Sequence, residues 1–251
     1  MNRSEINKFR YFLKDSVRQT IDFYDTDQNR GVAPPPIEKP YPEGSGLIDL
    51  VPVLELQNIS SLDFMTLIKN RSSHRKFLPV ALTLKELSFL LWVTQGIRKV
   101  AGPTAAFRTV PSAGCRHSLE TYLSIFNVES LEVGIYRYLP VEHKLLPVSQ
   151  PDMLSIKVAA AALGQEFVGK SAVTFIWSVV PYRMEWRYDI ASHKVIAIDA
   201  GHVCQNLYLA CEAIHAGTCA VAAYNQDMMD ELLGLDGNEE FTIYLAPVGK
   251  V

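Results

Sequence analysis

The chain has 251 residues, 48% of them hydrophobic, and a formal net charge of -3 at pH 7. This length and composition suffice for one large domain with a sizeable core, and the balanced charge argues against a nucleic-acid binder. No apolar run is long enough to span a membrane. Four cysteines without a C-x-x-C pair, and a polar N-terminus without an apolar signal region, predict a cytoplasmic protein with reduced thiols.

Residues 1–46 differ in composition from the remainder of the chain. Ser4 is suited to cap a short helix. The apolar residues of that helix are Ile6, Phe9, Phe12 and Leu13. The stretch GVAPPPIEKPYPEGSG that follows is rich in Pro and Gly and has no helical or strand periodicity, so we expect an extended strap or a linker. The main domain is predicted to span residues 47–251.

Hydrophobic patterns in the main domain predict a mixture of helices and strands. The best-marked helix is TLKELSFLLWVTQG, in which Thr83 and Glu86 form a capping box and Gly96 follows the last turn. Further helices are expected at 62–69 behind a Ser61 cap, at PDMLSIKVAAAALG, at 192–216 and at QDMMDELLG. Strands are expected at ETYLSIFNV, GIYRYLP, HKLLPV, SAVTFIWSVV and EFTIYLAPVG. Because strict β-α-β alternation and a G-x-G-x-x-G turn are absent, the pattern indicates an α+β fold rather than a doubly wound one.

The helix expected at 192–216 is apolar around most of its circumference. Its apolar residues are Val195, Ile196, Ile198, Val203, Leu207, Tyr208, Leu209 and Ile214. Cys204 and Cys211 lie in the same run and are expected to face a core. Such a helix is buried on nearly all sides, either by its own chain or by a partner subunit, and we favour a dimer.

The stretch RSSHRKF, residues 71–77, concentrates hydrogen-bond donors in one short turn. Arg71 and Arg75 are four positions apart with Ser73 between them, so a turn would let all three converge. Arginine presents a planar fork that suits a phosphate. The alternative is a solvated surface turn, and this motif alone does not decide between the two.

Two further motifs lie far from this turn in the sequence. Pro111, Ser112, Ala113 and Gly114 precede a strand, and such small residues permit close backbone approach to a flat ligand. Lys250 follows a strand and a glycine at the end of the chain. The alternatives are an ordinary turn and a frayed basic tail.

Taken in order, these motifs resemble the nitroreductase superfamily, and most of all its SagB-type dehydrogenases, which are related to the thiazole/oxazole-forming oxidases. The resemblance is carried by NRSSHRKF, LSFLLWVTQGI, RTVPSAGCRHSLETYL, GIYRYLP, DAGHVCQNLYLACEAIHAG and LAPVGK, and it runs from about Leu47 to Lys250. It implies an α+β fold with a central, mostly antiparallel sheet flanked by helices. It also implies an intertwined homodimer with FMN bound at the subunit interface.

The resemblance assigns residues to the cofactor. Those that match contacts to the FMN phosphate and ribityl chain, or adjoin them, are Arg71, Ser72, Ser73, Arg75, Gly249 and Lys250. Those that match loops near the isoalloxazine ring are Pro111, Ser112, Ala113 and Gly114, contributed by the partner subunit, and Ala222 and Ala223. Gln95 lies in a W-x-x-Q-G element and is either near the flavin or structural.

One position departs from the branch that oxidises azoline rings. Those oxidases carry a Lys-Tyr pair ahead of the long helix, and here Tyr188 matches the tyrosine while Arg187 stands at the lysine position. Arginine stays protonated and cannot act as a base at ordinary pH. The alternative is that Arg187 pairs with Glu185 or Asp189 and faces solvent.

Three functions remain open. We favour an FMN-dependent oxidoreductase that moves a hydride from NAD(P)H to a small organic acceptor, with Arg187 as an electrostatic contributor and Tyr188 as a hydrogen-bond donor to the substrate. A SagB-type dehydrogenase that oxidises azoline rings in a peptide beside a partner cyclodehydratase is the second. A flavin-binding protein without turnover is the third. Metal-dependent chemistry has little support, because His202 and His215 lack an H-x-x-x-H spacing.

Overall fold

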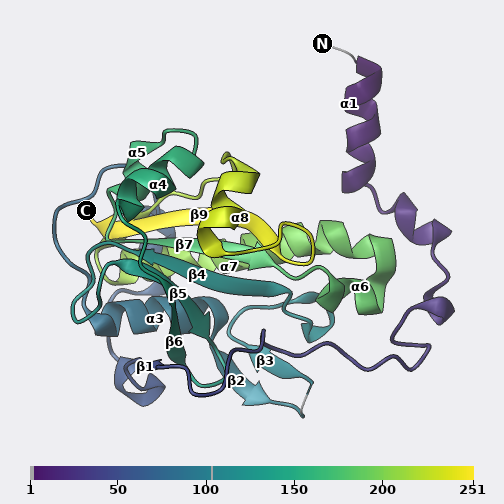
Figure 1. Ribbon diagram of the computed structural model, residues 1–251, viewed down its shortest axis with the longest axis horizontal. Helices are drawn as coiled ribbons and strands as arrows, with labels where there is room; N and C mark the ends of the chain where they lie inside the picture. Colours follow the sequence, from purple (N-terminus) through teal and green to yellow (C-terminus); the bar gives the residue numbers. More distant parts are fainter. Residues whose placement is uncertain (1–2, 103) are drawn as a thin grey trace.

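Seven strands form one antiparallel sheet at the centre of the molecule, a computed structural model that describes residues 3–102 and 104–251 (Figure 1). The strand order is β1-β6-β5-β4-β7-β9-β8, and these neighbours pair antiparallel. The strands are β1 (Ile48–Asp49), β4 (Leu119–Ile125), β5 (Gly134–Leu139), β6 (Lys144–Ser149), β7 (Val173–Val179), β8 (Ala216–Thr218) and β9 (Phe241–Lys250). The predicted α+β class is confirmed, and all of the predicted strands are present.

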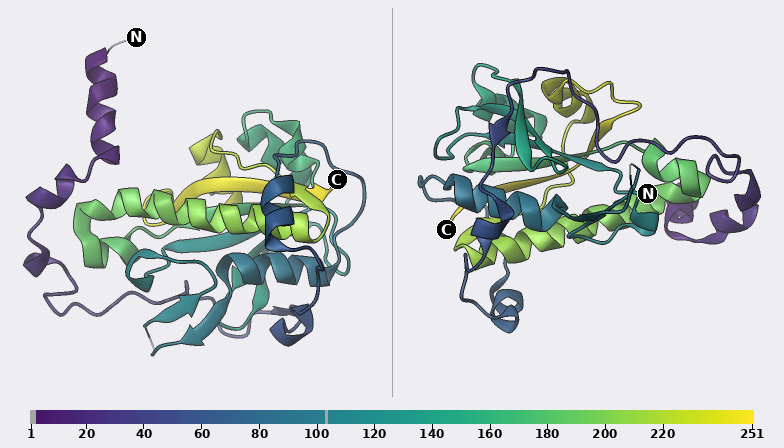
Figure 2. Two further views of the ribbon diagram at one scale, coloured as in Figure 1. Left: turned by 180° about the vertical axis from the view of Figure 1, so that it is seen from behind. Right: turned by 90° about the horizontal axis from the view of Figure 1, so that it is seen from below.

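Helices cover both faces of this sheet (Figure 2). The helices of the main domain are α2 (Phe64–Asn70), α3 (Leu84–Gln95), α4 (Leu154–Ala161), α5 (Glu166–Gly169), α6 (Tyr182–Tyr188), α7 (Ser192–Ala213) and α8 (Gln226–Leu233). Leu123 and Trp177 point to the face covered by α3 and α7, whereas Tyr122 and Ile176 point to the face covered by α4 and α8. Among the described helices, none has the length and apolar content needed to cross a bilayer.

Helix α3 begins and ends as the sequence predicts. The Thr83 hydroxyl accepts from the Glu86 amide at 3.2 Å, and the Glu86 carboxylate accepts from the Thr83 amide at 2.9 Å. This reciprocal capping box satisfies two amides that the helix itself leaves unpaired. Gly96 ends the helix with φ -60°, and a Cβ there would lie 2.3 Å from Trp92 Cδ1. Glycine is therefore needed for the close approach of Trp92.

Two helix boundaries differ from the prediction. Helix α2 is capped by Asp63, whose carboxylate accepts from the Thr66 amide at 3.1 Å, so the predicted Ser61 cap is wrong. Helix α7 stops at Ala213, and His215 adopts φ +54° before the chain enters β8. The predicted end at residue 216 is wrong because β8 pairs with β9 at this point.

The sequence analysis missed three elements that shape the site. Strands β2 (Ile97–Val100) and β3 (Ala106–Arg108) form a separate hairpin between α3 and the small-residue motif at 111–114. Both strands are short, and neither alternates clearly between apolar and polar residues, so the usual strand signal is weak. Helix α6 has only seven residues, too few for a helical period to stand out.

Helix α7 is buried on one face only in this chain. Cys204 and Cys211 are buried as predicted, and burial raises the pKa of the Cys204 thiol to about 12. The opposite face is exposed along a stripe made of Ala197, Ile198, Gly201, His202 and Gln205. The alternative in which the chain itself wraps the whole helix is therefore wrong.

The N-terminal segment begins with α1 (Arg3–Phe9), which stands apart from the body of the molecule (Figure 1). A helix is present as predicted, but Ser4 lies inside it and is not its cap. The helix also ends sooner than expected, because Phe12 and Leu13 belong to the 3-10 turn Arg10–Leu13 that follows. The apolar side chains of Phe9 and Leu13 are exposed.

The Pro-rich stretch is a strap fastened to the sheet by buried charges. Arg108 Nη2 donates to the Ile37 carbonyl at 2.8 Å, and Arg137 Nη2 donates to the Lys39 carbonyl at 2.8 Å. In return, the Lys39 amide donates to Glu120 Oε1 at 2.9 Å. The Lys39 ammonium also pairs with Glu240. Buried guanidinium and carboxylate groups need such partners, so this stretch is a docked strap rather than a free linker.

We predict that Glu38 makes stability depend on pH near neutrality. Burial raises the pKa of its carboxyl from 4.5 to about 7, helped by the nearby carboxylates of Glu142 and Glu120 and opposed by the Val141 amide. The stability from this group is fully present below pH 4.5 and is lost as the pH rises through about 7. The midpoint of thermal unfolding should fall over that interval, and Glu38→Gln should flatten the fall.

The matched control is Glu142→Gln, which removes a neighbouring exposed charge. In this variant the unfolding midpoint should still fall with rising pH, but the fall should occur at lower pH, because the pKa of Glu38 would be raised less. An unchanged slope in Glu38→Gln would contradict the assignment.

Candidate functional site

The predicted site residues gather at two places along α7, the long helix that crosses one face of the molecule (Figure 2). The first, which we call the arginine turn, is residues 71–75 and lies beside Tyr208. The second, which we call the PSAG loop, is residues 111–114 and lies beside Asp199. Tyr208 follows Asp199 by nine positions, which is about 14 Å along a helix axis.

The backbone of the arginine turn is fastened to the edge of the sheet. The Arg71 amide donates to Leu67 O at 3.1 Å and ends α2. Ser73 pairs with Thr218 of β8 as an isolated parallel bridge, and the His74 amide donates to Thr218 O at 2.9 Å. The segment is therefore fixed to the edge of the sheet and is not a loose surface loop. It runs without the tight turn that the sequence analysis expected, because its backbone pairs with Thr218.

Tyr208 organises the side chains of this turn, and the sequence analysis treated it only as an apolar helix residue. Its hydroxyl lies 3.0 Å from Ser73 Oγ and accepts from the Ala220 amide at 2.9 Å. The Arg71 guanidinium carbon lies 5.3 Å from the centre of its ring, within cation–π range. The sequence feature that could have revealed this role is a tyrosine, an aromatic residue with a polar hydroxyl, inside an apolar helix.

The charges of this turn are only partly compensated. Among the described residues, neither Arg71 nor Arg75 forms an ion pair, and Ser72 Oγ contacts His74 Nε2 at 2.8 Å. Lys250 differs, since its ammonium pairs with Glu86 and donates to Ile214 O at 2.8 Å. Two uncompensated arginines beside serine hydroxyls suit a phosphate, whereas the charge of Lys250 is already neutralised.

The other residues predicted at this end are placed by packing. A Cβ at Gly249 would lie 2.9 Å from Phe77 Cβ, so this glycine lets the chain after the arginine turn pack on β9. Ala222 and Ala223 are exposed, and the Ala223 carbonyl accepts from Gln165 Nε2 at 2.9 Å. Within TCAVAAY, Ala220 is the residue joined to Tyr208.

The PSAG loop is held against α7 by a buried carboxylate that the sequence analysis did not single out. Burial raises the pKa of the Asp199 carboxyl, and the neighbouring Ser112 hydroxyl and Ala113 amide oppose that rise. Asp199 Oδ2 has no hydrogen-bond partner among the described residues. Gly114 adopts φ +57°, a conformation that glycine tolerates best.

Arg187 and Tyr188 lie directly against this loop. A Cβ at Gly114 would fall 2.6 Å from the Tyr188 hydroxyl and 2.9 Å from Arg187 Cδ. The Arg187 guanidinium stacks on the Tyr188 ring at 5.5 Å. The alternative with an exposed ion pair is wrong, because Arg187 is half-buried and Glu185 pairs instead with His193.

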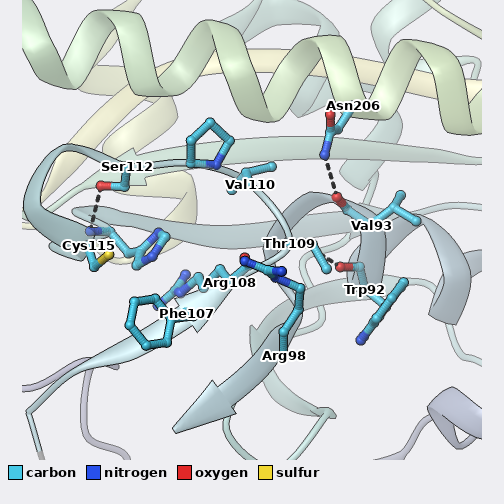
Figure 3. Close-up of a pocket in the computed structure, with 12 residues that line it drawn as sticks. Trp92, Val93, Arg98, Phe107, Arg108, Thr109, Val110, Ser112, Cys115 and Asn206 are labelled. Atoms are coloured by element: carbon cyan, nitrogen blue, oxygen red, sulfur yellow. Dashed lines mark hydrogen bonds between the residues drawn. The ribbon is translucent and has the colours of Figure 1, made fainter. Parts of the chain in front are cut away.

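A cavity of about 640 Å³, which we call the hairpin cavity, lies between α3, the β2–β3 hairpin and the PSAG loop (Figure 3). Its lining residues are Trp92, Val93, Arg98, Phe107, Arg108, Thr109, Val110, Pro111, Ser112, Cys115, His117 and Asn206. Burial and the charges of Arg108 and Arg116 lower the pKa of His117 to about 3, so this imidazole is neutral. Gln95 is buried behind the cavity and accepts from Arg108 Nη1 at 2.8 Å, which makes it structural.

The chain thus has an α+β fold in which the predicted site residues form two clusters along α7, a basic segment at 71–75 and a loop of small residues at 111–114. The model of the nitroreductase family matches residues 68–250. The chain therefore belongs to the nitroreductase family, and the oxidoreductase class follows from that membership.

Individual relatives agree with this assignment. The Methanocaldococcus jannaschii protein "Putative nitroreductase MJ1384" is 29% identical over 197 residues, which cover 78% of this chain and 96% of that protein. The trifolitoxin-processing protein TfxB of Rhizobium leguminosarum bv. trifolii is 24% identical over 185 residues, 72% of this chain but 45% of its own length.

Solved structures show the same architecture. A "putative nitroreductase" from Ralstonia eutropha JMP134 superposes with a TM-score of 0.69 and 25% identity, covering 87% of this chain and 94% of that one. The E. coli microcin synthetase McbBCD complex contains a chain with a TM-score of 0.60 and 20% identity, covering 81% and 84% respectively. At that identity the second likeness concerns the fold alone.

Proposed function

We propose that this protein is an FMN-dependent oxidoreductase that transfers a hydride, or two electrons, between NAD(P)H and a small organic acceptor. The observation that carries the proposal is the arginine turn, whose backbone is fixed to the sheet. In it the Arg71 guanidinium and the Ser73 hydroxyl are brought together by Tyr208, and the exposed Arg75 follows two residues later, with neither arginine paired to a carboxylate among the described residues. A phosphate monoester is the ligand that such a fork recognises.

The residues present fit FMN. Arg71 and Arg75 would bind the phosphate, Ser73 would hydrogen-bond to the phosphate or the ribityl chain, and Tyr208 keeps Ser73 and Arg71 in place. Lys250 would contribute little net charge to this site, because its ammonium is paired with Glu86. When bound, FMN supplies the site that accepts and donates the hydride, while the protein supplies position and electrostatics.

Arg187 and Tyr188 favour a reductive reaction. An oxidase that aromatises a ring needs a base to take a proton from carbon, and that base must have a pKa near the working pH. An arginine cannot serve as that base. Arg187 would instead attract an anionic substrate or stabilise negative charge beside the PSAG loop. Tyr188, whose hydroxyl faces Gly114, would donate a hydrogen bond to the substrate.

We further propose that two copies complete each site. The exposed stripe of α7 includes Ala197 and Gly201, whose small side chains allow a close helix–helix approach. If two copies of α7 cross antiparallel between Gly201 and Gln205, Asp199 of one copy lies close to the level of Tyr208 of the other. The PSAG loop of one copy would then face the arginine turn of its partner.

A peptide-tailoring dehydrogenase that oxidises azoline rings is the second candidate. TfxB is named as a toxin-processing protein, and it is a sequence relative. Against this candidate stands Arg187, which occupies the position where the resemblance places a tunable lysine.

The first prediction for this site concerns cofactor identity. Heat-released cofactor should chromatograph as FMN, and Arg75→Ala should weaken FMN binding about 10- to 100-fold, because a charge-assisted hydrogen bond is lost. Lys76→Ala is the matched control, since Lys76 is the adjacent exposed cation, and it should bind FMN normally. Recovery of FAD, or an unchanged affinity in Arg75→Ala, would refute the assignment.

The second prediction concerns the stripe on α7. A Cβ added at Gly201 meets nothing within 4 Å in one chain, and the position is exposed, so Gly201→Gln should fold normally as judged by circular dichroism. It should nevertheless shift the protein from dimer to monomer in light scattering and lower its FMN affinity in parallel. A wild-type monomer at micromolar concentration, or a Gly201→Gln dimer with full FMN content, would contradict the two-copy site.

The third prediction separates the candidate functions. The FMN-loaded protein should oxidise NADH or NADPH with a quinone or a nitroaromatic acceptor and should leave a thiazoline peptide unchanged. Arg187→Lys should retain the reductase reaction. Thiazoline oxidation by the wild type without donor-driven reduction would favour the peptide-tailoring enzyme, and bound FMN without either reaction would indicate a flavin-binding protein.

A further inference from the structure

The hairpin cavity carries positive charge that the proposed cofactor site does not use. Arg98 and Arg108 both line it, and no Asp or Glu does. Among the described residues, neither arginine forms an ion pair. A cavity of about 640 Å³ is within the size range of small-molecule sites.

The side chain of Arg98 is oriented by a hydrogen bond to the backbone. Its Nε donates to the Arg108 carbonyl at 2.9 Å, which fixes one edge of the guanidinium. The two terminal nitrogens make no hydrogen bond within the described chain and remain available as a fork. Figure 3 shows Arg98 reaching from β2 to a place between Phe107 and Trp92.

Arg108 adds a second, deeper cation. Its side chain is only 3% exposed, and its terminal nitrogens are engaged by Gln95 and by the strap at Ile37. Its Nε is buried without any hydrogen-bond partner among the described residues. An unpaired buried donor is costly. The charge of Arg108 is partly balanced by the nearby carboxylates of Glu120 and Glu38, so Arg98 is the cation that an anion in the cavity would meet.

The walls of the cavity are aromatic. Phe107, 40% exposed, and the half-buried Trp92 both line it. The Asn206 amide lies at its upper edge, where its Nδ2 donates to Val93 O at 2.8 Å, and its carbonyl oxygen has no hydrogen-bond partner among the described residues. Flat apolar walls around a guanidinium fork suit a planar aromatic ring that carries a carboxylate.

We propose that the hairpin cavity is the acceptor site of this enzyme and that it selects planar aromatic carboxylates through Arg98. The reactive part of such an acceptor would lie at the Pro111–Ser112 side of the cavity, against the PSAG loop. This inference rests on the proposed function for the reaction itself, but the binding of the carboxylate does not require turnover.

The test measures binding first. Benzoate and the neutral analogue benzamide are titrated calorimetrically into the FMN-loaded wild type and three variants. Benzoate should bind more tightly than benzamide, and Arg98→Ala should weaken benzoate about 10- to 100-fold without affecting benzamide. Arg98→Lys should give an intermediate loss, because it keeps the charge without the fork. Lys99→Ala, an exposed cation on the same strand, should match the wild type.

The second arm measures turnover with 4-nitrobenzoate and 4-nitrobenzamide. In each, one NAD(P)H and one proton convert the nitro group to a nitroso group and release water. Arg98→Ala should raise KM for the nitrobenzoate selectively and leave KM for the dinucleotide unchanged. A benzoate preference that is lost in Arg98→Ala while no acceptor is reduced would support the anion site and refute the proposed function.

Three outcomes would overturn the inference. Equal binding of benzoate and benzamide by an active enzyme would show that the cavity does not select a carboxylate. Loss of FMN from Arg98→Ala would show that the cavity holds the cofactor. A rise in KM for NADPH alone would assign Arg98 to the electron donor.

Discussion

The carboxylate of Glu120, buried in the central strand β4, is the group on which the surroundings of the site depend. It pairs with Arg183 of α6 and accepts from the strap at Lys39. Burial opposes its ionisation, but Arg183, Arg108 and Arg137 outweigh burial and hold the pKa of Glu120 below its usual value. Removing one partner from such a buried pair typically costs about 3–5 kcal/mol. The Glu120 carboxylate of the sheet thus interacts with the strap through Lys39, with the hairpin through Arg108 and with α6 through Arg183.

Arg183 connects this buried carboxylate to the PSAG loop. Its other terminal nitrogen donates to the His117 carbonyl at 3.4 Å, just beyond the PSAG loop. The same helix carries Arg187 and Tyr188 against Gly114. The ion pair of Arg183 with Glu120 therefore anchors the helix that carries these two residues beside the loop. Tyr208 performs the corresponding task at the arginine turn, with a neutral hydroxyl in place of a charge.

The features that could be predicted from the sequence are those determined by residues close together in the chain. The capping box of Thr83 and Glu86, the strands with apolar or aromatic runs and the arginine turn could each be found within a few adjacent residues. Asp199 and Tyr208 could not, because their roles arise from contacts with segments that are distant in sequence. The β2–β3 hairpin was missed for a second reason: its strands are stabilised by pairing with each other and by Arg98, not by an apolar face.

The strap also takes the place of solvent around two buried arginines. Its carbonyl groups at Ile37, Lys39 and Pro40 surround the ends of Arg108 and Arg137 in the way that water surrounds an exposed guanidinium. The strap lies outside the segment matched by the family model, yet it solvates two cations inside that segment. In this chain, the polypeptide before the family domain supplies the hydrogen-bond acceptors that water would otherwise provide to these two buried guanidinium groups.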